Sequence, residues 1–168
     1  MELEMHPHQW ERRAPDWPAA IVSGLVAGAV LMVMDLIWSS IMSSGDTWRS
    51  SHLISAIVLG PSALQDNAFN MGVVAVALVT HYALGVVFAL CLAFIVAGFH
   101  YESSVPMIET IGAMFGIGVY VISMHGWSHV FPWITELRGW ATLIGHMVFG
   151  MTAALTYWKL AQRGRVAG

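Results

Sequence analysis

The feature that most constrains this chain is a set of four long apolar runs that carry almost no charge. They cover residues 19–41, 71–98, 105–124 and 140–160. About 20 apolar residues are enough to cross a bilayer as a helix. A lone segment in lipid must satisfy its own backbone hydrogen bonds, so each run is expected to be helical. The sequence therefore predicts an all-α fold, an integral membrane four-helix bundle.

The composition supports this class and excludes others. Only 10% of the 168 residues are charged and 57% are hydrophobic, whereas about 25% of residues are charged in ordinary soluble domains. Such a chain is not intrinsically disordered. A net charge of −3 with seven Lys and Arg residues excludes a nucleic-acid partner. One cysteine excludes an internal disulfide framework. The expected partner is the lipid bilayer.

The positive charges outside the runs predict the topology. We expect an N-terminal tail at residues 1–18, one four-span domain at residues 19–160 and a C-terminal tail at residues 161–168. The positive residues on the side of the tails are Arg12, Arg13, Lys159, Arg163 and Arg165. The loops after the first and third spans carry only Arg49 and Arg138. By the positive-inside rule, both tails are expected in the cytoplasm.

The loops after the first and third spans have apolar centres of their own. Residues 48–61 are mostly apolar after Arg49 but are too short to span, which favours an interfacial or re-entrant segment. Gly60 and Pro61 are expected to end that segment. Residues 125–139 have a similar composition. Short interfacial segments are therefore predicted in both outer loops.

The second and fourth spans resemble each other at one constant offset along the chain. The matched pairs are His81 and His146, Gly85 and Gly150, Ala89 and Ala154, and Leu90 and Leu155. The first and third spans each hold two glycines four residues apart: Gly24 and Gly28, then Gly112 and Gly116. A duplication would give two parallel helix-loop-helix repeats, and chance similarity is the alternative. The glycines alone predict closely packed helices.

Ionisable side chains inside a membrane are costly and point to function by default. Counted from the outer ends of their spans, Asp35 and His146 lie about 9 Å deep and His81 about 15 Å deep. His125 lies at the outer end of the third span, and His129 follows in the loop. Four helices are therefore predicted to place one such residue each in the outer half of the membrane.

Three interpretations of these residues stay open. The first is a network of interhelical hydrogen bonds that needs no ligand. The second is a b-type haem with His81 and His146 as axial ligands, for which Gly85 and Gly150 would leave room. The third is a divalent-metal or proton site. Its ligands would be Asp35, His125, His129 and His146.

Three segments carry a resemblance to a known group of proteins. They are ERRAPDW at residues 11–17, GLVAG at residues 24–28 and AIVLGP at residues 56–61. In these segments the chain resembles small uncharacterised bacterial inner-membrane proteins, which sometimes carry a sodium:proline symporter label. Four spans cannot form the much larger bundle of that symporter. The resemblance therefore implies a bacterial inner membrane and no particular activity.

The chain holds no nucleophile elbow, phosphate loop, zinc-protease or dinucleotide motif. The leading functional hypothesis is a non-catalytic accessory or assembly subunit of a larger bacterial inner-membrane complex, such as a respiratory one. One alternative is a haem b- or metal-binding membrane redox protein. Another is a small oligomeric transporter or channel. Other membrane subunits, or copies of the same chain, are the expected protein partners.

Overall fold

The computed structural model describes residues 14–42, 47–99 and 104–167, and all regular structure in these ranges is helical. The long helices are α1 (Trp17–Met42), α3 (Met71–Phe99), α4 (Val105–Val121) and α5 (Trp140–Ala167). A shorter helix, α2 (Arg49–Leu59), and the 3₁₀ turn η1 (Pro61–Leu64) lie between α1 and α3. Three short turns join α4 to α5: the π turn η2 (Ile122–Gly126) and the 3₁₀ turns η3 (Trp127–His129) and η4 (Pro132–Leu137).

Three segments are long and apolar enough to cross a membrane. They are Trp17–Ile41, Met71–Ala97 and Val105–His129. The first three predicted runs are thus confirmed as helical segments of sufficient length and hydropathy, and the third extends past its predicted end because the π turn continues α4. The fourth predicted run is also a long helix, α5, but it does not reach the same hydropathy. The mean hydropathy of α5 is lowered by His146 and by three threonines, at positions 142, 152 and 156.

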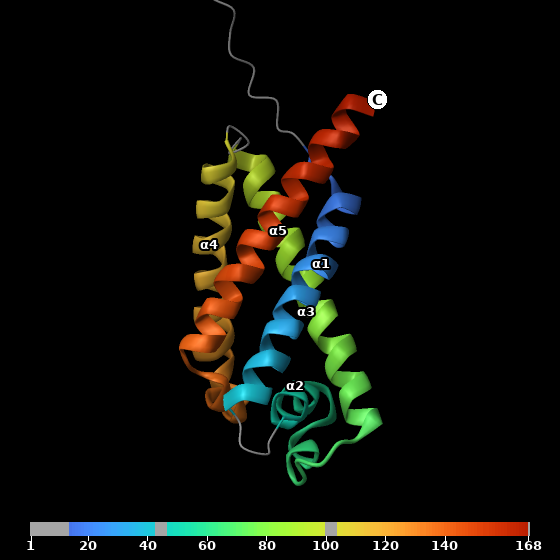
Figure 1. Ribbon diagram of the computed structural model, residues 1–168, viewed down its shortest axis with the longest axis vertical. Helices are drawn as coiled ribbons and strands as arrows, with labels where there is room; N and C mark the ends of the chain where they lie inside the picture. The colour runs from blue at the N-terminus through green and yellow to red at the C-terminus, as the bar shows by residue number, and fades with distance from the viewer. Residues whose placement is uncertain (1–13, 43–46, 100–103, 168) are drawn as a thin grey trace, which may run out of the picture.

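The four long helices lie side by side and alternate in direction (Figure 1). Helix α5 crosses in front of the bundle and packs on α4 and α1, and α1 also packs on α3. The start of α1 and the end of α5 lie at one end of the bundle. We call the opposite end, where α2 lies, the cap end. Residues 1–13, which make up most of the predicted N-terminal tail, lie outside the described residues.

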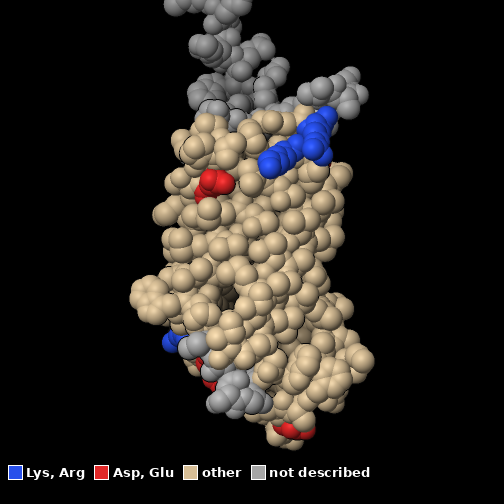
Figure 2. All heavy atoms as spheres, in the orientation of Figure 1, with Lys and Arg blue, Asp and Glu red and all other residues tan. Residues whose placement is uncertain are grey.

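The outside of the bundle is apolar. Only 28%, 22% and 22% of the three spanning windows are buried inside the protein. On the face shown in Figure 2, acidic and basic residues gather at the two ends, and the long stretch between them carries none. An apolar band of this extent requires lipid or other membrane helices to cover it. The protein is therefore a membrane protein.

Glycines bring the helices together at two crossings. A Cβ atom at Gly24 of α1 would lie 2.7 Å from the Cα atom of Val86 and 2.8 Å from the carbonyl oxygen of Gly85, both on α3. A Cβ atom at Gly112 of α4 would lie 2.5 Å from the carbonyl oxygen of Gly150 on α5. Ordinary side chains do not fit at such distances, so the backbones themselves are in contact. The close packing predicted from the paired glycines is confirmed.

The two crossings have the same register. In the first, Gly24 faces residues 85–86 and Gly28 faces residues 81–82. In the second, Gly112 faces residues 150–151 and Gly116 faces residues 146–147. The facing residues on α3 and α5 are those that the sequence comparison aligns at one constant offset.

The loops at the cap end form two caps that are fastened to each other. The first cap is residues 47–70 and the second is residues 122–139. The Arg49 guanidinium donates two hydrogen bonds from Nη2 to the Glu136 carboxylate, at 2.9 and 2.8 Å, and Nε adds a third at 3.1 Å. The Trp133 indole donates to the Leu53 carbonyl oxygen at 3.2 Å. These contacts connect the α1–α3 hairpin to the α4–α5 hairpin.

Inside the first cap, the segment that the sequence predicts as interfacial or re-entrant forms a short helix, and its predicted end at Gly60 and Pro61 is present. Helix α2 stops at Gly60, whose φ of +79° suits glycine alone, and Pro61 opens the next turn. His52 is 3% exposed. Its two ring nitrogens lie 2.6 and 3.0 Å from the carbonyl oxygens of Ala63 and Ala68. His52 therefore anchors the segment between α2 and α3.

Candidate functional site

Asp35 is the carboxylate of α1, close to the cap end of that helix. The side chain is half-buried, and Oδ1 accepts a hydrogen bond of 3.4 Å from the Ser50 hydroxyl in the first turn of α2. This length is near the upper limit for a hydrogen bond, so the contact is weak. A carboxylate with a single weak donor in a mostly apolar setting retains free acceptor capacity for a proton or a cation.

His81 of α3 is fixed by the neighbouring helix. Its Nε2 atom lies 2.9 Å from the carbonyl oxygen of Gly28 on α1. A carbonyl oxygen only accepts, so Nε2 carries the hydrogen and donates. The imidazole is thereby oriented across the α1–α3 crossing, and its Nδ1 atom remains available to accept a proton.

His146 of α5 is fixed within its own helix. Its Nδ1 atom donates to the carbonyl oxygen of Thr142, one turn earlier, at 2.8 Å. Its ring also meets the ring of Tyr120 on α4 edge-to-face, with centroids 5.9 Å apart. The Nε2 atom of His146 has no hydrogen-bond partner among the described residues, so it is the nitrogen free to exchange a proton.

The three ionisable residues belong to one cluster. Asp35 is on α1, His81 on α3 and His146 on α5, and α1 packs on both α3 and α5. Three packed helices therefore contribute one ionisable group each. The sequence predicts these residues in one layer but does not show which of their helices pack together.

Tyr120 extends the cluster toward the surface, and sequence analysis missed it. Its ring meets that of His125 edge-to-face at a centroid distance of 6.0 Å, and it contacts His146 in the same way. His125 is exposed. Tyr120 also lines a cavity of about 230 Å³, together with Gly139, Trp140 and Leu143. A signal was present, since a tyrosine inside a span has a hydroxyl that must find a partner or water.

The predicted metal ligands are not gathered into one site. Across the part of the chain that is described, no three His, Cys, Asp or Glu side chains are grouped so as to hold a metal ion. His125 lies in the π turn and His129 in the following 3₁₀ turn, and both are exposed. The four-residue spacing that would align their rings holds only in a continuous α-helix. The structure therefore gives this ligand set no support.

The gap proposed for a haem is occupied by helix backbone. Gly85 packs against the Gly24 carbonyl oxygen of α1, and Gly150 packs against Gly112 of α4. The two glycines thus face two different helices and leave no slot between the histidines. His81 also uses Nε2, the nitrogen expected to bind iron, on a carbonyl oxygen. The residues present do not fit a haem held between His81 and His146.

No protein-family model, no curated protein and no solved structure matches this chain, so its function has to be argued from these residues.

Proposed function

We propose that this protein is a small transporter or channel that takes up protons, or another small monovalent cation, at a cluster of Asp35, His81 and His146. The observation that supports the proposal is that three packed helices each contribute an ionisable side chain with hydrogen-bonding capacity to spare: one nitrogen of each imidazole is used on a backbone carbonyl oxygen, and Asp35 has only the weak Ser50 contact. Chains of carboxylate and imidazole groups are the usual means of moving protons through membrane proteins.

The roles follow from the hydrogen bonds. One nitrogen of each imidazole donates to a backbone carbonyl oxygen, which leaves the other nitrogen to accept and release a proton. Asp35 is the acceptor of this series on α1, at the cap end, because its carboxylate has only the weak Ser50 contact. Tyr120 and the exposed His125 form the route from the cap end to His146.

The topology proposed with this function has four spans, in a bacterial inner membrane, with both chain ends in the cytoplasm. Support comes from α5, which lies alongside the three apolar spans, and from the shared location of the start of α1 and the end of α5. The test is labelling with a membrane-impermeant maleimide in a Cys91→Ser background. A cysteine placed at Asp66, in the first cap, should react in intact cells. A cysteine placed at Arg163 should react only after lysis. The reverse pattern would invert the topology.

The two hairpins are also proposed to be an internal duplication. The common register of the α1–α3 and α4–α5 crossings supports it, because two unrelated pairs of glycine-rich helices would have no reason to match residue for residue. If the hairpins arose by duplication, His81 and His146 descend from the same residue of one ancestral hairpin. Their different hydrogen bonds would then be a later divergence of the two halves.

Proton flux in proteoliposomes tests the function directly. With an imposed membrane potential, the wild-type protein should pass protons faster than protein-free vesicles, and Asp35→Asn should remove the excess. Glu109→Gln is the matched control, because Glu109 is the carboxylate of α4 near the opposite end of the bundle. Wild-type flux equal to that of empty vesicles, or full flux in Asp35→Asn, would overturn the proposal.

A second candidate is an accessory subunit of a larger inner-membrane complex. The observation that favours it is the small buried share of each spanning helix, which leaves long apolar faces that other helices could cover. Mild extraction from native membranes, followed by mass spectrometry of the intact assembly, separates the two candidates. A stoichiometric partner supports the subunit function, whereas a homo-oligomer of this chain supports the transporter.

A further inference from the structure

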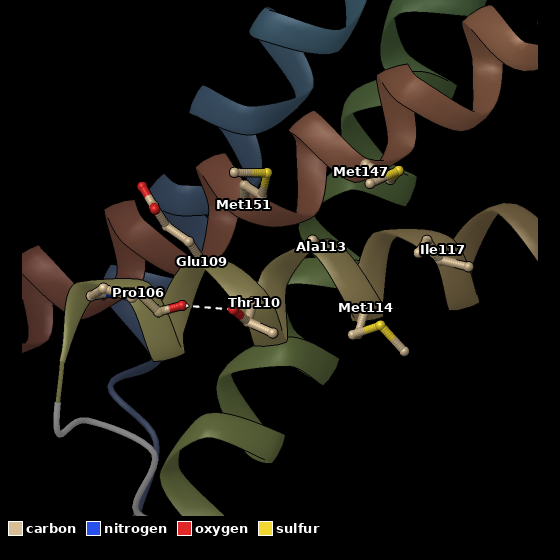
Figure 3. Close-up of a pocket in the computed structure, with 8 residues that line it drawn as sticks. All are labelled: Pro106, Glu109, Thr110, Ala113, Met114, Ile117, Met147 and Met151. Atoms are coloured by element: carbon tan, nitrogen blue, oxygen red, sulfur yellow. Dashed lines mark hydrogen bonds between the residues drawn. The ribbon is translucent and has the colours of Figure 1, made fainter.

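A groove runs along the outer surface of the α4–α5 pair, away from the ionisable cluster. Its volume is about 400 Å³. It is lined by Met147 and Met151 of α5 and by Ala113, Met114 and Ile117 of α4 (Figure 3). Methionine side chains are flexible and polarisable, so they adapt to apolar ligands of irregular shape.

One carboxylate stands at the end of this groove that is nearer the chain termini. Two side chains of the lining are polar, and the Thr110 hydroxyl is already used, since it donates to the carbonyl oxygen of Pro106 at 2.8 Å. Glu109 has no hydrogen-bond or ion-pair partner within the described ranges. Its carboxylate projects away from Thr110 and Met114, toward the α5 side (Figure 3).

The length of the groove corresponds to one leaflet of a bilayer. Its lining on α4 extends from Pro106 to Ile117. At the rise of an α-helix this is about 16 Å, close to half of the ~30 Å hydrocarbon thickness. Glu109 is one turn from the start of α4, or about 6 Å along the helix. The carboxylate therefore lies near the headgroup level, and the methionines lie at the depth of the acyl chain.

We propose that this groove is a binding site for a phospholipid with a primary-amine headgroup. One acyl chain lies along Ala113, between the methionines of the two helices, and the ammonium group pairs with the Glu109 carboxylate. The argument for this occupant is charge complementarity. An unpaired carboxylate attracts an ammonium and repels an anionic headgroup. The site is independent of the proposed transport function.

Lipid competition measured by mass spectrometry of the intact protein tests the site. The protein is equilibrated in nanodiscs with equal amounts of phosphatidylethanolamine and phosphatidylglycerol, and the retained lipid is identified. We expect phosphatidylethanolamine to be retained about fivefold over phosphatidylglycerol, which is the size of a partly exposed ion pair. Glu109→Gln should bring the ratio to about one, and Asp35→Asn should leave it unchanged.

A second variant tests the position of the acyl chain. Ala113→Phe fills the middle of the groove and should lower the retention of both lipids while the protein stays folded. Equal retention of the two lipids by the wild type, or a preference that survives Glu109→Gln, would overturn the headgroup assignment. Unchanged lipid retention in Ala113→Phe, or a partner helix found in the groove instead of lipid, would overturn the site itself.

Discussion

The Nε2 atom of His81 donates a hydrogen bond of 2.9 Å to the carbonyl oxygen of Gly28, across the α1–α3 crossing. The neighbouring glycines bring the two helices close enough for this contact. A carbonyl that already accepts a hydrogen bond within its own helix uses its second lone pair here. The histidine therefore both orients a titratable group and ties two helices together.

Replacing His81 with alanine should destabilise the bundle by about 0.6–2 kcal/mol, the range measured for hydrogen bonds between membrane helices. The measurement is reversible unfolding in mixed micelles. His146→Ala is the matched control, because its lost bond lies within α5 and joins no second helix. Equal losses of unfolding free energy in the two variants would show that the hydrogen bond between helices stabilises the bundle no more than the bond within α5 does.

Gly116 and Gly118 offer a comparison on one helix. A Cβ atom at Gly116 would overlap the carbonyl oxygen of His146, whereas one at Gly118 would meet nothing within 4 Å. Gly116→Ala should therefore push α4 from α5 and cost about 1–3 kcal/mol, as overpacking does. Gly118→Ala should cost nothing. The free energy of unfolding checks this, and a tolerated alanine at Gly116 would contradict the crossing.

The Arg49–Glu136 pair should make a small and salt-dependent contribution. The two side chains are 26% and 48% exposed. Solvent screening limits such pairs to about 0.2–1 kcal/mol. A double-mutant cycle with Arg49→Gln and Glu136→Gln should measure a coupling in that range at low salt and less at high salt. A coupling near zero at low salt would mean that the Trp133–Leu53 bond alone holds the caps together.

Gly60 should resist substitution because of its backbone conformation. Its φ of +79° with a ψ of −176° lies in a region that costs other residues about 1–3 kcal/mol. Gly60→Ala should loosen the junction between α2 and η1, and faster hydrogen exchange in residues 52–64 would report it. Gly139→Ala is the control, since that glycine has no positive φ and a Cβ there meets nothing within 4 Å. Equal rates of hydrogen exchange in residues 52–64 for the two variants would contradict this explanation of Gly60.

The sequence predicts the long helices and the end of the first-cap segment at Gly60, because hydropathy and turn chemistry are local properties. It does not predict that this segment is a helix. It did not predict which helix each glycine faces. Gly85 was read as room for a cofactor, whereas the structure places α1 there, and only the helix packing decides between these alternatives. The position of Tyr120 between the rings of His125 and His146 is not predictable from the sequence for a similar reason, since it depends on how separate segments pack.

The link between the caps also has a consequence for biogenesis. Arg49 precedes Glu136 by 87 residues, and two further long helices, α3 and α4, lie between them. While the first hairpin is being synthesised, the carboxylate that Arg49 binds in the finished fold has not yet been made. Glu136 is made only with the second hairpin, after α3 and α4. The ion pair can therefore form only once both hairpins are present, and it would then help to hold the two hairpins together.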